Sequence, residues 1–474
     1  MNRRRFLKSS GTVALAPAVA TTAAAANDKI GVAIIGCGGM GRMDLTDFQK
    51  QPDVEIRAVC DAFRPSAEQA RRMTGDRAEI HGDFRRVLDR KDIDAVVIAT
   101  PDHWHALMMV SACEAGKDVY VEKPISHTVR EGRLMVEAAR RHGRVVQVGI
   151  QQRSGAHFQR AVKAVQDGRI GDVHFAQCWN HNYSPDSKGM GFPSETPPPA
   201  DLDWDMWLGP APKVPYTPAR RNFRVFWDYA GGELTNWCVH LLDVVHWALR
   251  LDAPQTVMSS GGKWYFQDCR ECADTQEVVW EYPGNVLVRY STLAHNSFGP
   301  NGHPGNKSFG SYGIMFQGTK GTMFIDRAGY EITPQMAMHT EKESAGAREA
   351  YDDLVGFGQY FTSETSAERG SGSSQHLPHV RNFVDSVKTR ARPAGDIEIG
   401  HKSTAPCLIG NIALRTGMKL RWDGKAERFT NSGSQCDADA LLSRALAARG
   451  HGRISYSLRS AAIGSTRVAR RAGI

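Results

Sequence analysis

The sequence has no uninterrupted apolar run of about 20 residues, the length that a helix needs to cross a bilayer. It also has no internal repeats and no heptads, which excludes repeat solenoids and coiled coils. Cysteine pairs are scarce as well: among nine cysteines, only Cys269 and Cys272 form a Cys-x-x-Cys pair. The second pair that a structural zinc site needs is missing. We therefore interpret this pair as part of a loop and expect no bound metal.

Positive charge is concentrated at the two ends of the chain. The formal net charge of the 474 residues is +8, but four basic residues precede residue 27 and seven arginines follow residue 440. The region between them is mildly acidic and has no basic stripe that would follow a phosphate backbone, so we expect no nucleic-acid partner. With 41% hydrophobic and 23% charged residues, the composition is that of a globular protein. The length predicts two domains with extensions.

The two termini read as extensions. Residues 1–26 resemble a twin-arginine export signal, because Arg3 and Arg4 precede a weakly apolar stretch that ends in a run of alanines. A basic tail and a short membrane anchor are the alternatives, but the stretch is too short to span a bilayer. We expect a mature protein in the periplasm or another extracytoplasmic space, without a membrane span. Residues 431–474 are rich in Ser, Gly, Ala and Arg, and we expect a disordered basic tail there.

Strand and helix patterns alternate over residues 27–150. Continuous apolar runs predict strands, and periodic segments ending near glycine predict helices. The expected strands are 30–35, 54–60, 94–99, 119–121 and 145–148, and helices are expected over 106–115 and 131–141. Apolar runs that alternate with helices are typical of a parallel sheet covered on both faces. The first domain is therefore expected to be a Rossmann-type, doubly wound α/β domain.

The rhythm changes over residues 151–430, which we expect to form a second, α+β domain. Residues 176–230 are rich in Trp, Pro, His and Asn and predict long loops. Residues 255–335 predict short, mostly antiparallel strands, and residues 345–374 predict an exposed loop. Helices are expected over 238–249, 379–389 and 401–416.

A glycine-rich segment follows the first expected strand. Gly36, Gly38, Gly39, Met40 and Gly41 belong to the match to Gly-x-Gly-x-x-Gly that precedes a helical stretch. Asp61 ends the next strand, twenty residues after the last glycine, which completes the dinucleotide fingerprint. The helix N-terminus offers amides to the pyrophosphate, and Asp61 is expected to accept hydrogen bonds from the ribose. Its charge would repel a 2′-phosphate, so we expect NAD rather than NADP, although Arg64 would soften that preference.

Two further segments end strands at the same edge of the expected sheet. One contains Thr100, Pro101 and His105, and the other is the segment Glu122-Lys123-Pro124. With the glycine loop and a later Gly-Gly…His-x-x-Asp segment at 231–243, these features resemble the Gfo/Idh/MocA family (glucose–fructose oxidoreductase, inositol dehydrogenase and relatives) over about residues 29–430.

That resemblance implies a second domain with a large, open, mostly antiparallel sheet, a sugar or polyol substrate, and a homodimer or homotetramer. It also implies cofactor-binding roles for Thr100, Pro101, His105 and Glu122. Lys123 is then expected beside the nicotinamide and the substrate hydroxyl, and Gln151 near the carboxamide. His105 has the alternative of capping the following helix.

The second signature predicts the groups that handle protons. Asn236, His240 and Asp243 recur at spacings of four and three, which places them on one helix face. Oxidation of an alcohol needs a base, so His240 is expected to be the general base and Lys123 its electrostatic partner. Polyol dehydrogenases of the family often carry Asp where this chain has Asn236, which leaves Asp243 as the alternative residue to orient His240. With His246 these side chains also have metal-ligand spacing, but the chemistry needs no metal.

Aromatic and basic residues supply candidates for the substrate site. Tyr183 and Trp237 offer faces that stack on a sugar, and Arg153 and Arg221 offer donors to hydroxyl groups. An aromatic core cluster is the alternative for the tryptophans.

Three functions remain open from the sequence. The first is an NAD(P)-dependent oxidoreductase acting on a CH–OH group of a carbohydrate. The second is a glycosidase that keeps NAD bound through a cycle of oxidation, elimination, hydration and reduction. The third is a non-catalytic, NAD-containing sugar-binding protein.

Overall fold

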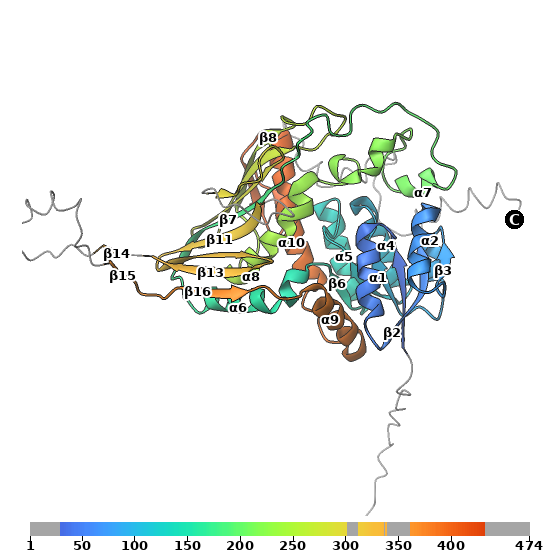
Figure 1. The fold of residues 1–474 in the computed structure, drawn as a ribbon, viewed down its shortest axis with the longest axis horizontal. Coiled ribbons are helices and arrows are strands. Elements are labelled where there is room, and N and C mark those ends of the chain that lie inside the picture. Colours follow the sequence, from blue (N-terminus) through green and yellow to red (C-terminus); the bar gives the residue numbers. More distant parts are fainter. Residues whose placement is uncertain (1–28, 301–310, 336, 339–360, 432–474) are drawn as a thin grey trace, which may run out of the picture.

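The structure is a computed structural model that describes residues 29–300, 311–335, 337–338 and 361–431 (Figure 1). The expected export signal at 1–26 and all but the first residue of the expected tail at 431–474 lie outside these residues. Within the described part, no helix is both long enough and apolar enough to cross a membrane.

The first domain is a six-stranded parallel sheet with the strand order β3-β2-β1-β4-β5-β6, as the apolar runs predict. Its strands are β1 (Ile30–Ile35), β2 (Val54–Cys60), β3 (Glu79–His81), β4 (Ala95–Ile98), β5 (Asp118–Val121) and β6 (Val146–Val148). Its helices are α1 (Gly39–Gln49), α2 (Arg64–Met73), α3 (Phe84–Leu88), α4 (Asp102–Glu114) and α5 (Val129–Arg141). Every residue of β1, β4 and β5 is buried, because helices cover both faces.

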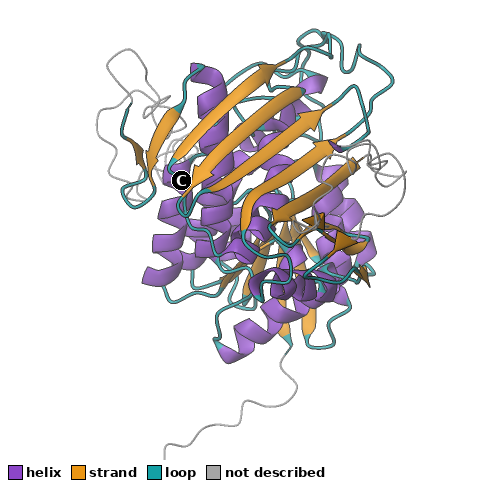
Figure 2. Cartoon of the chain, turned by 90° about the vertical axis from the view of Figure 1, so that its left-hand side faces the viewer, coloured by secondary structure: helices purple, strands orange, loops and turns teal. Residues whose placement is uncertain are grey.

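The second domain is built on a ten-stranded sheet with the order β16-β13-β12-β11-β7-β10-β9-β8-β17-β18. Only the β7–β10 pair is parallel in this sheet as described, so it is mostly antiparallel. The strands are β7 (Val173–His181), β8 (Thr256–Gly262), β9 (Thr275–Tyr282), β10 (Val286–Leu293), β11 (Ser311–Gly318), β12 (Gly321–Asp326), β13 (Gly329–Pro334), β16 (Glu368–Ser371), β17 (Leu420–Asp423) and β18 (Arg428–Phe429). Figure 2 shows this sheet nearly face-on with helices behind it.

Helices connect and cover this sheet. They are α6 (Ala156–Gln166), the short α7 (Trp204–Leu208), α8 (Val239–Leu249), α9 (His376–Thr389) and α10 (Ile397–Thr416). Of these, α6, α8 and α10 contact the sheet strands. A short strand pair, β14 (Ala337–Met338) and β15 (Phe361–Thr362), lies outside the large sheet.

The expectation of loops over residues 176–230 is wrong at its start. Residues 176–181 belong to β7, which lies between β10 and β11 in the middle of the sheet. Polar residues at the end of this strand interrupt the apolar pattern, and their partners are distant in sequence: Asn180 donates to Glu233 Oε2 at 3.2 Å, and His181 bonds to Ser291 Oγ at 2.7 Å. The loop expected over 345–374 likewise contains the edge strand β16.

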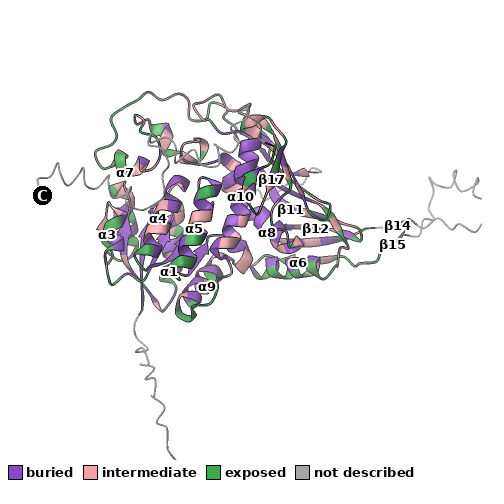
Figure 3. Cartoon of the chain, turned by 180° about the vertical axis from the view of Figure 1, so that it is seen from behind, coloured by how far each residue is buried: buried purple, intermediate pink, exposed green. Residues whose placement is uncertain are grey.

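The chain returns to the first domain before it ends. Val380, Phe383 and Val384 of α9 pack with Phe48 of α1 and Tyr120 of β5 in one buried cluster. The helix α10 contacts both α5 and the sheet strand β8, and Figure 3 shows mostly buried residues along it. The described helices of residues 376–416 therefore pack against both domains. The boundary at residue 150 applies to the order of the sequence, whereas the hydrophobic core includes residues from both sides of it.

Candidate active site

The glycine loop has the backbone shape that a dinucleotide site needs. Gly36 has φ +91°, and a Cβ on Gly41 would lie 1.8 Å from the carbonyl oxygen of Gly36. A Cβ on Gly38 or Gly39 would meet nothing within 4 Å, so this part of the loop faces open space. The N-terminus of α1 has no side-chain cap, so its free amides can bind a pyrophosphate. The residues present therefore fit NAD.

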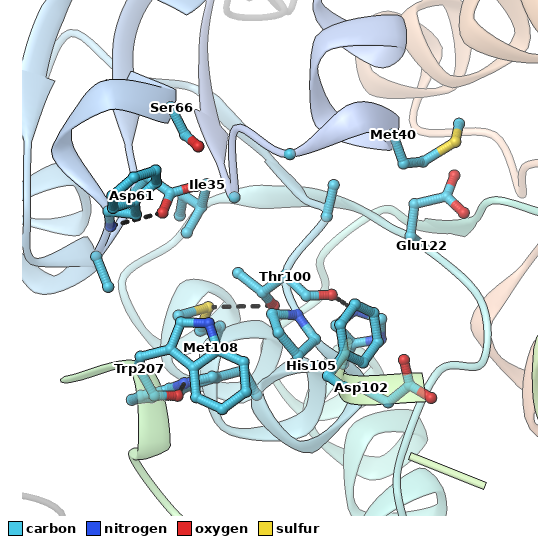
Figure 4. A pocket seen from close by; sticks show the side chains of 18 of the residues that line it. Ile35, Met40, Asp61, Ser66, Thr100, Asp102, His105, Met108, Glu122 and Trp207 are labelled. Carbon is cyan, nitrogen blue, oxygen red and sulfur yellow. Dashed lines mark hydrogen bonds between the residues drawn. The ribbon is translucent and has the colours of Figure 1, made fainter. Parts of the chain in front are cut away.

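Asp61 closes the adenosine end of the pocket that the loop lines (Figure 4). Its carboxylate accepts hydrogen bonds from the amides of Cys37 at 2.7 Å and Phe63 at 2.8 Å, which leaves lone pairs for ribose hydroxyls. Burial raises its pKa, and these hydrogen bonds and Arg221 act in the opposite direction. The guanidinium of Arg221 lies 4.1 Å from the centre of the Phe63 ring. The structure thus places Arg221, expected at the substrate, beside the adenosine end, and pairs Arg64 with Glu68 at 2.8 Å.

The ends of β4 and β5 are joined by one histidine. His105 places its Nε2 2.9 Å from the carbonyl oxygen of Thr100 and its Nδ1 2.7 Å from that of Pro124. Burial lowers its pKa to about 4. His105 therefore fixes the two strand ends relative to each other, with Pro101 as the residue before α4. Thr100, Pro101 and His105 all line the pocket, as does Met40.

Glu122 lies at the other end of this pocket (Figure 4). Gln151 donates to its Oε1 at 3.0 Å, and the Lys123 amide donates to its Oε2 at 3.3 Å. Burial raises the pKa of Glu122 to about 7, and the buried Asp44 nearby has its own pKa raised by burial and by Glu122. A Cβ on Gly149 would lie 2.2 Å from Glu122 Oε1, so a glycine is required beside this carboxylate.

Lys123 connects the two domains. Its Nζ donates to the carbonyl oxygen of Asn236 at 2.8 Å and to Asn236 Oδ1 at 3.0 Å. The lysine follows β5, whereas Asn236 lies in the π-helical turn Leu234–Cys238 that precedes α8. Burial lowers the pKa of Lys123. Two of the expected catalytic residues, Lys123 and Asn236, are therefore in contact at the end of the pocket.

His240 lies near the same point but without the orienting residue expected for it. It is 6% exposed, and its Nδ1 has no hydrogen-bond partner in the described structure. Burial lowers its pKa well below the usual value, and Lys123 and Arg327 lower it further. A neutral imidazole is the form that can accept a proton.

Asp243 does not orient His240. Its carboxylate binds Arg153 Nε at 2.8 Å and Ser403 Oγ at 2.7 Å, and its side chain is fully buried. The expectation that Asp243 replaces the missing acid at position 236 is therefore wrong, because both oxygens are used between η1 (Gln151–Ser154), α8 and α10. Arg153, expected at the substrate, is held by this ion pair.

The remaining candidate site residues do not lie together in the structure. Tyr183 is 60% exposed and does not line the pocket. The Trp237 ring lies 5.2 Å from the Tyr312 ring at an angle of 38°, and it also lies beside His240. His246 bonds to the Tyr282 hydroxyl at 2.7 Å. Among the described residues, no group of three or more His, Cys, Asp or Glu side chains is placed to hold a metal ion.

Sequence reasoning missed three charged residues around Lys123. Asp102 and Arg224 line the pocket, and Glu233 lies within electrostatic range of the lysine. Burial raises the pKa of Asp102 to about 7. The position of Asp102 between two motif residues was the available signal, whereas Arg224 lies in the short 3-10 helix Phe223–Val225, within a segment that has no sequence periodicity.

Family models match both halves of this arrangement. Residues 30–150 match the oxidoreductase family's NAD-binding Rossmann fold, and residues 165–267 match its C-terminal alpha/beta domain. The chain belongs to the Gfo/Idh/MocA family. The predicted family, fold class and NAD-binding domain of this Gfo/Idh/MocA chain are thereby confirmed.

Individual relatives match only part of this chain. The inositol 2-dehydrogenase of Klebsiella pneumoniae is 31% identical over 158 residues, which are 33% of this Gfo/Idh/MocA chain and 46% of that protein. A glycosyl hydrolase family 109 protein from a Shewanella species is 32% identical over 171 residues, 30% of this chain and 37% of that protein. The chain thus matches less than half the length of these relatives.

A solved structure supports the fold over most of the chain. The scyllo-inositol dehydrogenase of Lactobacillus casei, solved with NAD(H) and scyllo-inositol, superimposes with a TM-score of 0.57. The match covers 83% of this Gfo/Idh/MocA chain and 99% of that one at 17% identity. At this identity the likeness is one of fold.

Proposed function

We propose that this protein transfers a hydride between NAD and a CH–OH group of a sugar, polyol or related carbohydrate. The observation that carries the proposal is the contact between Lys123 and Asn236, which brings the end of the NAD pocket to the helix that bears His240. The matched inositol dehydrogenase and the dehydrogenase fold support the same chemistry.

Each residue of the site has its own role in the proposed hydride transfer. NAD, when bound, accepts or returns the hydride. His240 is neutral because burial lowers its pKa, so it can take the hydroxyl proton. The Lys123 ammonium stabilises the developing alkoxide, and Asn236 fixes its Nζ through two hydrogen bonds. Gln151 and Glu122 shape the nicotinamide end of the pocket.

The test is a substitution of His240 with a matched control on the same helix. His240→Ala should lower turnover about 10²- to 10⁴-fold while NAD still co-purifies. His246→Ala removes another buried histidine of α8, whose partner is Tyr282, and should leave turnover of the folded protein unchanged. A fully active His240→Ala variant would remove His240 as the base.

A second candidate is a glycosidase that keeps NAD bound, which the matched glycosyl hydrolase family 109 protein favours. The same lysine and histidine would then serve oxidation and the return reduction in one cycle. Purified protein should be screened on polyols and on glycosides. Net NADH production supports the dehydrogenase, bond cleavage without net NADH supports the glycosidase, and bound NAD with neither activity supports a binding protein.

We further propose that residues 1–26 direct export by the twin-arginine route. The order of basic, apolar and small residues supports this. Replacing Arg3 and Arg4 by Lys together should leave the full-length protein in the cytoplasm. Mature protein reaching the envelope in that variant would show that the proposal is wrong.

A further inference from the structure

The guanidinium of Arg327 lies within electrostatic range of His240 and forms no salt bridge with a described residue. Arg327 lies in the turn between β12 and β13, and its Nε is buried with no hydrogen-bond partner in the described parts of the chain. Burial lowers its pKa, and Tyr312 and then Glu122 act in the opposite direction. The oxygens of Glu122 are already bonded to Gln151 and to the Lys123 amide. A half-buried guanidinium without an anion is unfavourable, which indicates a missing anionic partner.

The contacts of Arg327 place it beside aromatic rings that lie next to His240. Its guanidinium carbon lies 5.2 Å from the centre of the Trp237 ring and 5.9 Å from that of Tyr312. The Trp237 ring in turn lies 6.3 Å from the ring of His240. Arg327 acts electrostatically on Glu122 in the first domain and on His240 in the second. It therefore converges on the space between the nicotinamide end of the pocket and the proposed base.

The turn that carries Arg327 is held in place. Asp326 Oδ1 accepts the amides of Ala328 at 2.7 Å and Gly329 at 3.1 Å. The Arg327 amide donates to the Tyr312 hydroxyl at 3.3 Å, and the imidazole of His157 lies 3.1 Å from the carbonyl oxygen of Asp326. The backbone that carries Arg327 is thus fixed before any ligand arrives, which lowers the entropy cost of binding.

We propose that Arg327 binds a carboxylate carried by the substrate, so that the substrate class is a sugar acid rather than a neutral sugar or polyol. This inference rests on the proposed function, because it names the substrate of the same site. The planar guanidinium matches a carboxylate with two parallel hydrogen bonds. His376, at the start of α9, lies within electrostatic range of Arg327, and burial together with this guanidinium lowers its pKa. With Lys123 at the reacting hydroxyl, the carboxylate and the CH–OH group lie on the same substrate.

The experiment is a calorimetric titration of the NAD-loaded protein with matched pairs of ligands. The pairs are glucuronate and glucose, galacturonate and galactose, mannuronate and mannose, and gluconate and glucitol. At least one acid should bind about tenfold or more tightly than its neutral partner. Arg327→Gln should weaken that acid about 10- to 100-fold and leave the neutral partner unchanged. Arg369→Gln is the control, because Arg369 pairs with Glu331 on the same sheet with a side chain that is 79% exposed.

The outcomes separate this inference from the proposed function. If no acid binds more tightly than its neutral partner, or if Arg327→Gln keeps the preference, the inference is wrong. Preferential binding of glucose 6-phosphate over every carboxylate would also overturn it. Binding is measured without turnover, so an acid that binds through Arg327 but is never oxidised would refute the hydride transfer alone. Should Arg327→Gln fail to fold, the preference of the unmodified protein and the weaker preference expected for Arg327→Lys still decide.

Discussion

Two lysines flank β5, the buried Lys117 and the half-buried Lys123, and their exchange for methionine separates catalysis from packing. Lys117 precedes the strand and donates to the carbonyl oxygens of Arg90 at 2.6 Å and Ile93 at 2.7 Å. Lys123 follows it and donates to two oxygens of Asn236 at 2.8 and 3.0 Å. Burial lowers the pKa of both lysines. The two side chains are therefore matched in hydrogen bonding and lie at opposite edges of the same sheet.

Each substitution removes two charge-assisted hydrogen bonds and one charge, which is buried at Lys117 and half-buried at Lys123. Hydrogen bonds to charged groups contribute about 1.5–3 kcal/mol, and release of the buried ammonium offsets part of the loss. We expect each variant to lose about 1–3 kcal/mol of unfolding free energy, with similar decreases in Tm. Turnover should differ: Lys123→Met should lower kcat about 10²- to 10⁴-fold, whereas Lys117→Met should leave it unchanged.

The assay follows NADH at saturating substrate and quantifies NAD released from the denatured protein. Both variants should retain NAD, because the glycine loop and Asp61 are intact. Equal losses of turnover in the two variants would show that Lys123 acts through the fold. A Lys123→Met variant within about tenfold of the unmodified kcat would refute its role in alkoxide stabilisation.

Three further results are expected. Asp61→Ala should weaken the binding of NAD by about 1.5–3 kcal/mol and reduce the preference of the protein for NAD over NADP. Competition titrations measure both effects. If the unmodified protein prefers NADP, the role assigned to Asp61 is wrong. Gly41→Ala should abolish NAD retention, because its methyl group meets a loop carbonyl oxygen at 1.8 Å, and a variant that retains NAD would show that the loop can move. Burial opposes ionisation of Glu427, but hydrogen bonds from His401 and Arg133 hold its pKa at about 2, below the usual 4.5. The stabilisation that ionised Glu427 gives the folded state is therefore present above pH 4.5 and lost as the pH falls towards 2. Glu427→Gln should accordingly reduce the dependence of stability on pH in that window, as measured by acid unfolding followed by circular dichroism.

The sequence predicted the first domain well because its strands are buried on both faces. Continuous apolar runs such as Ile30–Ile35 have no competing interpretation once a glycine loop follows. The strand Val173–His181 was missed because two of its last residues, Asn180 and His181, are polar, and their partners lie more than 50 residues away in sequence. Long-range satisfaction of buried polar groups leaves no local pattern.

For the candidate site, too, the sequence predicted some residues and missed others. Glycine loop, Asp61 and Lys123 were found because each follows a strand, and the ends of parallel strands meet. The role assigned to Asp243 was wrong because helix spacing fixes a face but not a partner, and Arg153 was that partner. Arg327 gave no signal, because a turn residue between two antiparallel strands is ordinarily exposed.

The return of α9 to the first domain has a consequence for how the chain is made. Phe383 and its neighbours complete a cluster with Phe48 and Tyr120, which were synthesised more than 260 residues earlier. The NAD-binding domain leaves the ribosome first, and it thus exposes an apolar face until α9 has been translated. Residues 29–150 expressed alone should accordingly aggregate, and a fusion that borrows this half must also borrow residues 376–389. The order of synthesis and the order of folding are therefore different in this protein.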